Sequence, residues 1–133
     1  MGQAAHPGRT KQPIALVVED DVSVRDIASV LFEESEMRVI ACDNAEKAFA
    51  TLCHHGSETA VVFADVRLAG LMDGVDLAHR VRRMWPHIRV ILTSGHPGAA
   101  SDLPPDVVYL PKPWLALDLL VQAESASAKA RKH

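Results

Sequence analysis

The sequence predicts an α/β fold in which five strands form one parallel sheet and helices cover its faces, a (βα)5 arrangement. Short apolar runs rich in β-branched residues alternate along the chain with segments of helical periodicity. Several runs are apolar nearly throughout rather than at every second position, which is typical of strands buried on both faces. The length of 133 residues suits one domain.

Five apolar runs have the length of strands. The first, third and fourth lack alternation, so we expect helices to cover both of their faces. The runs span residues 14–18, 37–41, 60–64, 88–92 and 107–110.

Four helices are predicted from apolar stripes whose spacing lets each helix lie on the sheet. Asp43 or Asn44 is placed to cap the second helix, and Asp21 could cap the first. The stripes are Val24, Ile27, Ala28 and Leu31; Ala45, Ala48, Phe49 and Leu52; Leu77, Ala78, Val81, Met84 and Trp85; and Trp114, Leu117, Leu120 and Val121.

The helical pattern is weak between the fourth and fifth runs. Gly98 and the pair Pro104-Pro105 leave only residues 98–103 for a helix, because proline disfavours helical backbone at its own position and at the preceding residue. We therefore expect a short or irregular fourth helix.

The domain is expected to span residues 13–125. Residues 1–12 have no apolar stretch of the kind found in signal peptides and predict a disordered leader, and residues 126–133 predict a polar, basic tail. No apolar run is long enough to cross a membrane. Cys42 and Cys53 lack the spacing of a disulfide framework or a zinc site, which favours a cytoplasmic location with reduced thiols.

The balance of charge argues against binding to nucleic acid. The 14 basic and 17 acidic residues give a formal charge of −3, and both ends of the chain are basic, so the body is more acidic still. Lys and Arg supply most of the affinity for phosphate backbones. We expect no DNA-binding domain, for which the length also leaves little room.

Polar residues follow four of the five runs. Glu19 and Asp20 follow the first run, Asp65 the third, Ser94 the fourth and Lys112 the fifth. Because the carboxyl ends of parallel strands meet at one edge of the sheet, these residues should lie close together. Carboxylates crowded there repel one another, and a hard divalent cation with oxygen ligands relieves that repulsion. Mg²⁺ is the expected cofactor.

This set of side chains suits phosphoryl transfer. A cation held by Asp20 and Asp65, the Ser94 hydroxyl and the Lys112 ammonium would surround a tetrahedral anion with positive charge and donors. The nucleophile would be a carboxylate, which can accept a phosphoryl group as an acyl phosphate.

Four motifs, taken in order, resemble those of response-regulator receiver domains, the phosphoacceptor partners of histidine kinases in two-component systems. The motifs are LVVEDD at 16–21, FADVRLAGLMDG at 63–74, VILTSG at 90–95 and YLPKPW at 109–114. The resemblance covers roughly residues 13–125. It implies a flavodoxin-like sheet with strand order 2-1-3-4-5. It also implies a switch that catalyses only its own phosphorylation and dephosphorylation, not an enzyme.

The resemblance assigns the phosphoacceptor and the metal ligands. Asp65 would be phosphorylated and would bind Mg²⁺ together with Asp20. Glu19 would support the metal through water, and the backbone carbonyl of Arg67 would complete the protein ligands. Lys112 would pair with Asp65 or with its phosphoryl group.

The resemblance also assigns a switch and two tuning positions. Ser94 would bind the phosphoryl group, and Tyr109 would swing inward when that happens. The side chains of Arg67 and His96 would control how fast water reaches the acyl phosphate. The Lys112–Pro113 peptide would be cis, which proline makes accessible.

Three features depart from the common pattern of the family. Glu19 replaces an aspartate. Ala69 stands where the loop after the phosphoacceptor usually carries proline, so this loop should be less rigid. The interval from Ser94 to Lys112 is shorter than usual, which puts in doubt the output face normally built from the fourth helix, fifth strand and fifth helix.

The expected partners are a sensor histidine kinase or histidine phosphotransfer protein as donor, and an unidentified protein target. Two other hypotheses stay open. One is a pseudo-receiver that docks without phosphorylation. The other is a small aspartyl-phosphate phosphatase of the haloacid dehalogenase type, although such enzymes carry an acid two residues after the nucleophile, where this chain has Arg67.

Overall fold

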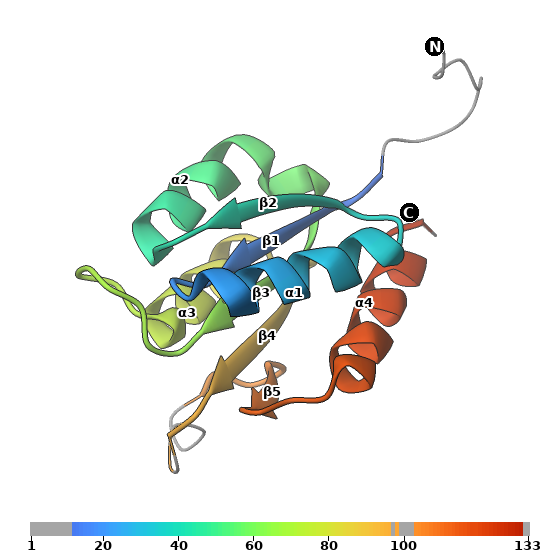
Figure 1. Cartoon of the computed structure of the whole chain (residues 1–133). Coiled ribbons are helices and arrows are strands. Elements are labelled where there is room, and N and C mark those ends of the chain that lie inside the picture. The colour runs from blue at the N-terminus through green and yellow to red at the C-terminus, as the bar shows by residue number, and fades with distance from the viewer. Residues whose placement is uncertain (1–11, 97, 99–102, 132–133) are drawn as a thin grey trace.

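The computed structural model describes residues 12–96, 98 and 103–131, and five parallel strands form its sheet in the order β2-β1-β3-β4-β5 (Figure 1). The predicted flavodoxin-like fold and strand order are confirmed. The strands are β1 (Ile14–Val18), β2 (Arg38–Cys42), β3 (Thr59–Asp65), β4 (Arg89–Ser94) and β5 (Val108–Pro111). The helices are α1 (Val22–Glu34), α2 (Ala45–His55), α3 (Gly74–Met84) and α4 (Ala116–Arg131), with a 3₁₀ turn over Gly56–Glu58.

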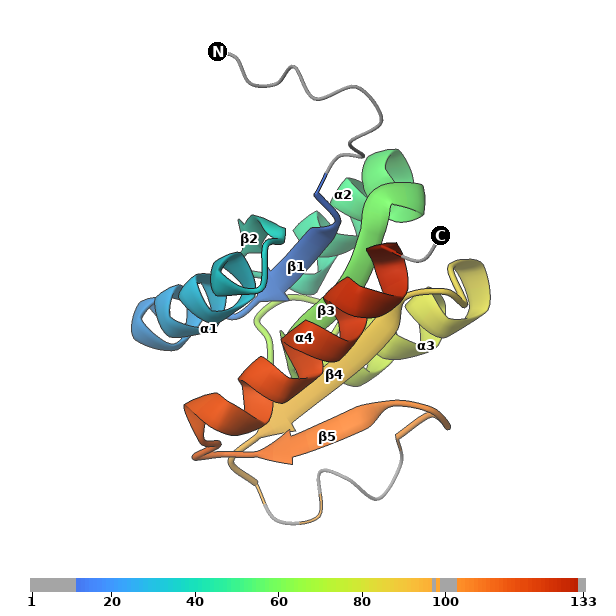
Figure 2. The ribbon, with the colours of Figure 1, turned by 90° about the vertical axis from the view of Figure 1, so that its right-hand side faces the viewer.

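Helices cover both faces of the sheet. Figure 2 shows α1 and α4 in front of the sheet and α2 and α3 behind it. Successive strand residues point to opposite faces, so each strand supplies both cores. In β3, for example, Val62 and Ala64 pack towards α2 and α3, whereas Val61 and Phe63 pack towards α1 and α4.

The three inner strands are the most deeply buried. Every residue of β1 is buried, as are all but one in each of β3 and β4, whereas the edge strands β2 and β5 are partly exposed. The prediction from their unbroken apolar runs is thus confirmed. Asp65 pairs with Thr93, and Ser94 pairs with Pro111, so β3, β4 and β5 end in neighbouring positions at one edge.

Side-chain caps define where three of the helices begin. The Asp21 carboxylate accepts from Val24 N at 3.1 Å, and the Asn44 amide oxygen accepts from Lys47 N at 2.8 Å. Asn44 rather than Asp43 therefore caps α2. Asp73 and Asp76 form a reciprocal capping box at the start of α3. Each cap stabilises a turn that follows the carboxyl end of a strand.

In the stripes predicted for the first three helices, two residues are exposed and do not belong to the core. Ile27 in α1 is 53% exposed and Met84 in α3 is 51% exposed. The buried face of α1 is narrow and consists of Ala28, Leu31 and Phe32. Ile27 lies about 100° around the helix from Ala28, which turns it away from the sheet.

The stripe predicted for the last helix is wrong. Leu117 and Val121 are exposed, and the buried face of α4 carries Leu119, Ala123 and Ala126 instead. These residues follow the spacing i, i+4, i+7 and are mostly small, so the helix lies close to the sheet. The prediction gave weight to the largest apolar side chains and overlooked the alanines.

The expected boundary at residue 125 is also wrong. α4 continues to Arg131, and Ala126 and Ser127 are buried, so residues 126–131 are part of the domain and not a frayed tail. Their polar composition describes only the outer face of the helix. No helix in the described ranges is long and apolar enough to span a bilayer. Of the expected leader, only Gln12 lies within the described residues, and it is exposed.

No helix occurs between β4 and β5 among the residues described there, which are 95, 96, 98 and 103–107. Most of the window 98–103, in which a short helix was predicted, falls outside the described residues. Asp106 has a positive φ of 68°. Its carboxylate oxygen Oδ2 lies 3.8 Å from the guanidinium nitrogen Nη2 of Arg82 in α3. That contact joins the segment before β5 to α3.

We predict that Gly74→Ala destabilises the domain. A Cβ at position 74 would lie 2.1 Å from the backbone oxygen of Asp65, and backbone cannot move aside as a flexible side chain can. The expected cost is about 2 kcal/mol, seen as a fall of several degrees in the thermal midpoint by circular dichroism.

The matched control for this substitution is Gly95→Ala. Among the described residues, a Cβ at position 95 would meet only the Lys112 Cβ, at an ordinary contact distance of 3.9 Å. This variant should unfold close to the wild-type midpoint. Equal thermal midpoints for wild type and Gly74→Ala would show that the close approach of residue 74 to the Asp65 backbone does not constrain the fold.

Candidate functional site

Residues from the ends of three strands meet at the carboxyl edge of the sheet. The Lys112 ammonium lies 2.6 Å from Asp65 Oδ2 and 3.3 Å from Glu19 Oε1. Glu19 directly follows β1, Asp65 ends β3 and Lys112 directly follows β5. The Lys112 backbone N–H donates to the carbonyl of Ser94, the last residue of β4, at 2.9 Å. Four segments that are distant in sequence therefore converge, as their positions after the apolar runs indicated.

The Asp65 carboxylate is held from two sides. Its Oδ1 accepts from Arg67 N at 2.9 Å, and its Oδ2 faces Lys112. The next residue, Val66, donates its N–H to the Thr93 carbonyl at 2.8 Å, which extends the pairing of β3 with β4. Asp65 is only 7% exposed. The carboxylate is thus oriented by the backbone and lies just below the surface.

Glu19 is more deeply buried, at 1% exposure. Its Oε2 accepts from Asp21 N at 3.1 Å, and its Oε1 faces Lys112. Arg25 of α1 donates to the Glu19 backbone carbonyl at 2.8 Å. The sequence analysis did not single out Arg25, because an arginine in the second turn of an amphipathic helix looks like any solvated residue.

The electrostatics of the site follow from these contacts. Burial raises the pKa of Glu19, and the charge of Asp65 raises it further, against the opposing effects of the Asp21 N–H and Lys112. Burial alone would lower the pKa of Lys112, but the hydrogen bond and charge of Asp65, together with Glu19, outweigh it and hold that pKa above its usual value. Lys112 is therefore held in its protonated form, between two acids that repel one another.

Asp20 is not bonded into this cluster. Its side chain is exposed, and within the described residues it makes no hydrogen bond or ion pair. In the same part of the chain, no three His, Cys, Asp or Glu side chains are grouped closely enough to hold a metal ion. Asp20 adjoins Glu19 in the chain, but among the described residues Lys112 pairs with Glu19 and Asp65 and not with Asp20.

Ser94 and Tyr109 are neighbours. The Tyr109 hydroxyl donates to the Ser94 carbonyl at 3.3 Å, and its half-buried ring packs on the core beneath α2 and α3. The Ser94 hydroxyl accepts from His96 N at 3.0 Å. Both His96 and Arg67 are exposed at the rim of the site.

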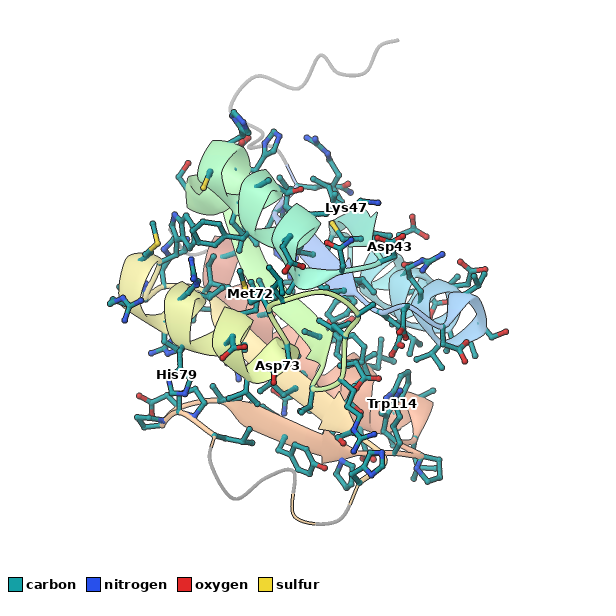
Figure 3. All side chains as sticks on the ribbon, turned by 90° about the vertical axis from the view of Figure 1, so that its left-hand side faces the viewer. Asp43, Lys47, Met72, Asp73, His79 and Trp114 are labelled. Carbon is teal, nitrogen blue, oxygen red and sulfur yellow. The ribbon has the colours of Figure 1, made fainter. Side chains whose placement is uncertain are left out.

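The segment that carries Lys112 is anchored beyond the lysine. The Lys112–Pro113 peptide is cis, as the resemblance implied. Trp114 packs edge-on against Phe63 of β3, with ring centroids 5.7 Å apart. The labelled Trp114 can be followed in Figure 3, on the side of the molecule away from α2. A buried aromatic contact thus holds the chain two residues past the ammonium.

A second residue that the sequence analysis missed is Glu46, in the first turn of α2. Its Oε2 accepts from Leu71 N at 3.0 Å and from Met72 N at 2.9 Å, in the loop that follows Asp65. No sequence signal marks this contact, because an acidic residue in the first turn of a helix already has a sufficient explanation in the helix dipole.

Sequence comparisons give related proteins for most of the chain. Residues 15–103 match the response regulator receiver domain. Nodulation protein W of Bradyrhizobium diazoefficiens is 30% identical over 98% of this chain, and the receiver protein CpdR of Brucella abortus is 27% identical over 82% of it. The chain spans 58% of the length of the former and 92% of the latter.

Solved structures give the same result for the fold. A response regulator receiver domain protein from Clostridium thermocellum superimposes with a TM-score of 0.78 at 20% identity, covering 90% of this chain and 98% of that one. The receiver domain of NtrX from Brucella abortus gives a TM-score of 0.73 at 26% identity, covering 86% and 98%.

The family match stops at residue 103, before β5, so Lys112 and Tyr109 are placed at the site by the geometry alone. The match nevertheless covers more than half of the chain, including the strand that ends in Asp65 and the strand that ends in Ser94. This chain belongs to the family of response regulator receiver domains of two-component systems, which are regulatory modules and not enzymes in the ordinary sense.

Proposed function

We propose that this domain accepts a phosphoryl group from a phosphohistidine onto Asp65, in a Mg²⁺-dependent reaction, and thereby changes its affinity for a protein partner. The observation that carries the proposal is the oriented Asp65 carboxylate, 2.6 Å from the Lys112 ammonium at the carboxyl edge of the sheet. The donor would be a sensor histidine kinase or a histidine phosphotransfer protein in the cytoplasm.

The transfer needs little beyond positioning and charge. A carboxylate oxygen of Asp65 attacks phosphorus as the N–P bond breaks, and the imidazole keeps that electron pair. Lys112, already charged and placed at Asp65, stabilises the negative charge on the transferring oxygens. The Arg67 N–H keeps the carboxylate from rotating away. The domain supplies these groups, and the partner supplies the phosphohistidine.

The donor atoms at this edge are of the kind that a hard divalent cation takes, although the described carboxylates are not gathered into one ligand group. Glu19, Asp20, Asp65 and the backbone carbonyl of Arg67 offer only oxygen ligands, which Mg²⁺ prefers. Two carboxyl groups face one ammonium here, and burial together with the charge of Asp65 raises the pKa of Glu19. A bound cation would relieve this repulsion and favour the ionised form of Glu19. Bound there, Mg²⁺ would neutralise charge on the phosphoryl oxygens.

Ser94 and Tyr109 would form the switch. The Ser94 hydroxyl sits on the strand next to Asp65 and would bond the phosphoryl oxygen, and Tyr109 already contacts the Ser94 backbone. A shift of Ser94 would therefore move Tyr109 and change the surface of β5. Arg67 and His96, exposed at the rim, would govern the access of water to the acyl phosphate.

We predict that Mg²⁺ and acetyl phosphate add one phosphoryl group to the protein, detected by intact mass, and that Asp65→Asn abolishes the adduct. The matched control is Asp26→Asn on the exposed face of α1, which should be phosphorylated like the wild type. An adduct that survives Asp65→Asn would refute the assignment. Full partner binding by Asp65→Ala would favour the docking module instead.

Removal of divalent cations should reduce the phosphorylation rate by about 100-fold, the loss typical when one electrostatic stabiliser of a transition state is removed. The measurement is the initial rate of adduct formation in EDTA, followed by the rate after Mg²⁺ is restored. A rate that is the same in EDTA and in Mg²⁺ would show that Lys112 alone supplies the positive charge.

Glu19→Gln should stabilise the metal-free protein at neutral pH, raising the thermal midpoint by roughly 4 °C, which corresponds to about 1 kcal/mol in a domain of this size. The physical reason is that the folded state holds the pKa of Glu19 above its unfolded value, so ionisation of this buried carboxyl opposes folding. This free-energy penalty on folding is fully present at pH values above the pKa that Glu19 has in the folded state.

The advantage of Glu19→Gln should disappear as the pH falls below the ordinary pKa of a glutamate, where the wild-type carboxyl is itself protonated. Glu33→Gln on the exposed face of α1 is the matched control and should leave the midpoint almost unchanged. A lower midpoint for Glu19→Gln at neutral pH would mean that its bond to Lys112 outweighs the cost of burial.

A further inference from the structure

The loop from Asp65 to α3 is fixed at both ends. At its start, Arg67 N donates to the Asp65 carboxylate at 2.9 Å. At its end, Gly74 N donates to the Val66 carbonyl at 2.9 Å, and Asp73 caps α3. The backbone of Arg67 thus belongs to a loop whose two ends are held within a few residues of the phosphoacceptor.

The backbone in the middle of this loop is hydrogen-bonded by one side chain from another element. Within the described residues, the only hydrogen bonds to residues 68–72 are those that the Glu46 carboxylate accepts from Leu71 N and Met72 N. Leu71 is fully exposed, whereas Leu68 and Met72 are partly buried and pack against the core on the side of α2 and α3. The bonds to Glu46 therefore fix the backbone of the stretch whose tip, at Leu71, has no packing of its own. Figure 3 shows the labelled Met72 on the same face as Lys47 in the first turn of α2 and Asp43 just before that helix.

The backbone of the loop is shaped to receive the Glu46 carboxylate. Gly70 has a φ of +106°, a conformation that side chains rarely adopt, and a Cβ there would lie 2.7 Å from Glu46 Oε1. The glycine therefore allows both the turn and the close approach of the carboxylate. The two N–H groups that follow it then point at one oxygen atom.

The helix α2 sets the place of Glu46. Asn44 caps the helix, which puts Glu46 in its first turn, next to the exposed backbone donors of the helix end. A carboxylate is stabilised there by the helix dipole. Its negative charge also strengthens the bonds from the loop N–H groups, because charge-assisted hydrogen bonds exceed neutral ones.

We propose that Glu46 is a positioning residue for phosphorylation, which clamps the loop so that the Arg67 carbonyl stays in place to bind Mg²⁺. Ala69 restricts the loop backbone less than the proline that is usual at this position. The two bonds to Glu46 supply the missing restraint. This inference rests on the proposed function, because the Arg67 carbonyl is a metal ligand only within it. Glu46 acts through the loop and does not touch the reacting atoms.

The test measures the initial rate of phosphorylation by acetyl phosphate as a function of Mg²⁺ concentration. Glu46→Ala should raise the half-saturating Mg²⁺ concentration about tenfold, as loss of an outer-shell partner does, and leave the rate at saturating Mg²⁺ within about twofold. Glu46→Gln, whose amide oxygen can accept the same two bonds, should stay close to the wild type.

Lys47→Ala is the matched control for the clamp. Lys47 is the next residue of α2, is exposed and pairs with Asp43 at 3.1 Å. It should leave the Mg²⁺ requirement unchanged. The thermal midpoint in EDTA should be similar for all three variants, because a solvent-exposed clamp contributes little to global stability. An unchanged Mg²⁺ requirement in Glu46→Ala, or equal losses in the Ala and Gln variants, would overturn the proposal.

Hydrogen exchange separates the clamp from the phosphorylation chemistry. In metal-free protein, Glu46→Ala should speed exchange of the Leu71 and Met72 amides at least tenfold and leave the core strands unchanged. Failure of wild type to be phosphorylated would refute the proposed function, whereas unchanged exchange at these two amides would refute the clamp.

Discussion

One ammonium group between two buried carboxylates is the interaction on which this domain depends. Lys112 bridges Asp65 and Glu19, and the three residues come from the ends of strands that are separated by most of the chain. The cluster is unbalanced, because two acids share one cation, and burial and repulsion raise the pKa of Glu19. An edge with surplus negative charge and a fixed ammonium suits a divalent cation and a phosphoryl group together.

The rest of the fold serves to hold that edge still. Three inner strands, buried almost completely, end beside one another and deliver their last residues to the same place. Gly74 lets α3 start directly against the Asp65 backbone, and Trp114 packs on Phe63 beyond Lys112. The short distances at the site thus depend on packing that lies beneath and beyond it.

Where the chain departs from the common family pattern, contacts within the same region replace the missing feature. The loop without its usual proline is bound by Glu46 through two backbone N–H groups. The described residues between β4 and β5 contain no helix, but Asp106 contacts Arg82 of α3 just before β5. α4 extends to Arg131 on a buried face of small residues, which enlarges the core on the side of α1.

The five strands, the burial of the inner three, the caps of α1 and α2 to within one residue, and the convergence of Glu19, Asp65 and Lys112 could be predicted from the sequence. The reason is that hydrophobic period, capping residues and the residues after a strand are local patterns. That Ile27 and Leu117 face solvent and that Ala126 belongs to the core depends on tertiary packing, since the buried side of a helix is set by what it packs against. The same holds for the exposed Asp20 and for Arg25 and Glu46. The partners of Arg25 and Glu46 are backbone groups of other segments, and no spacing along the chain encodes such a contact.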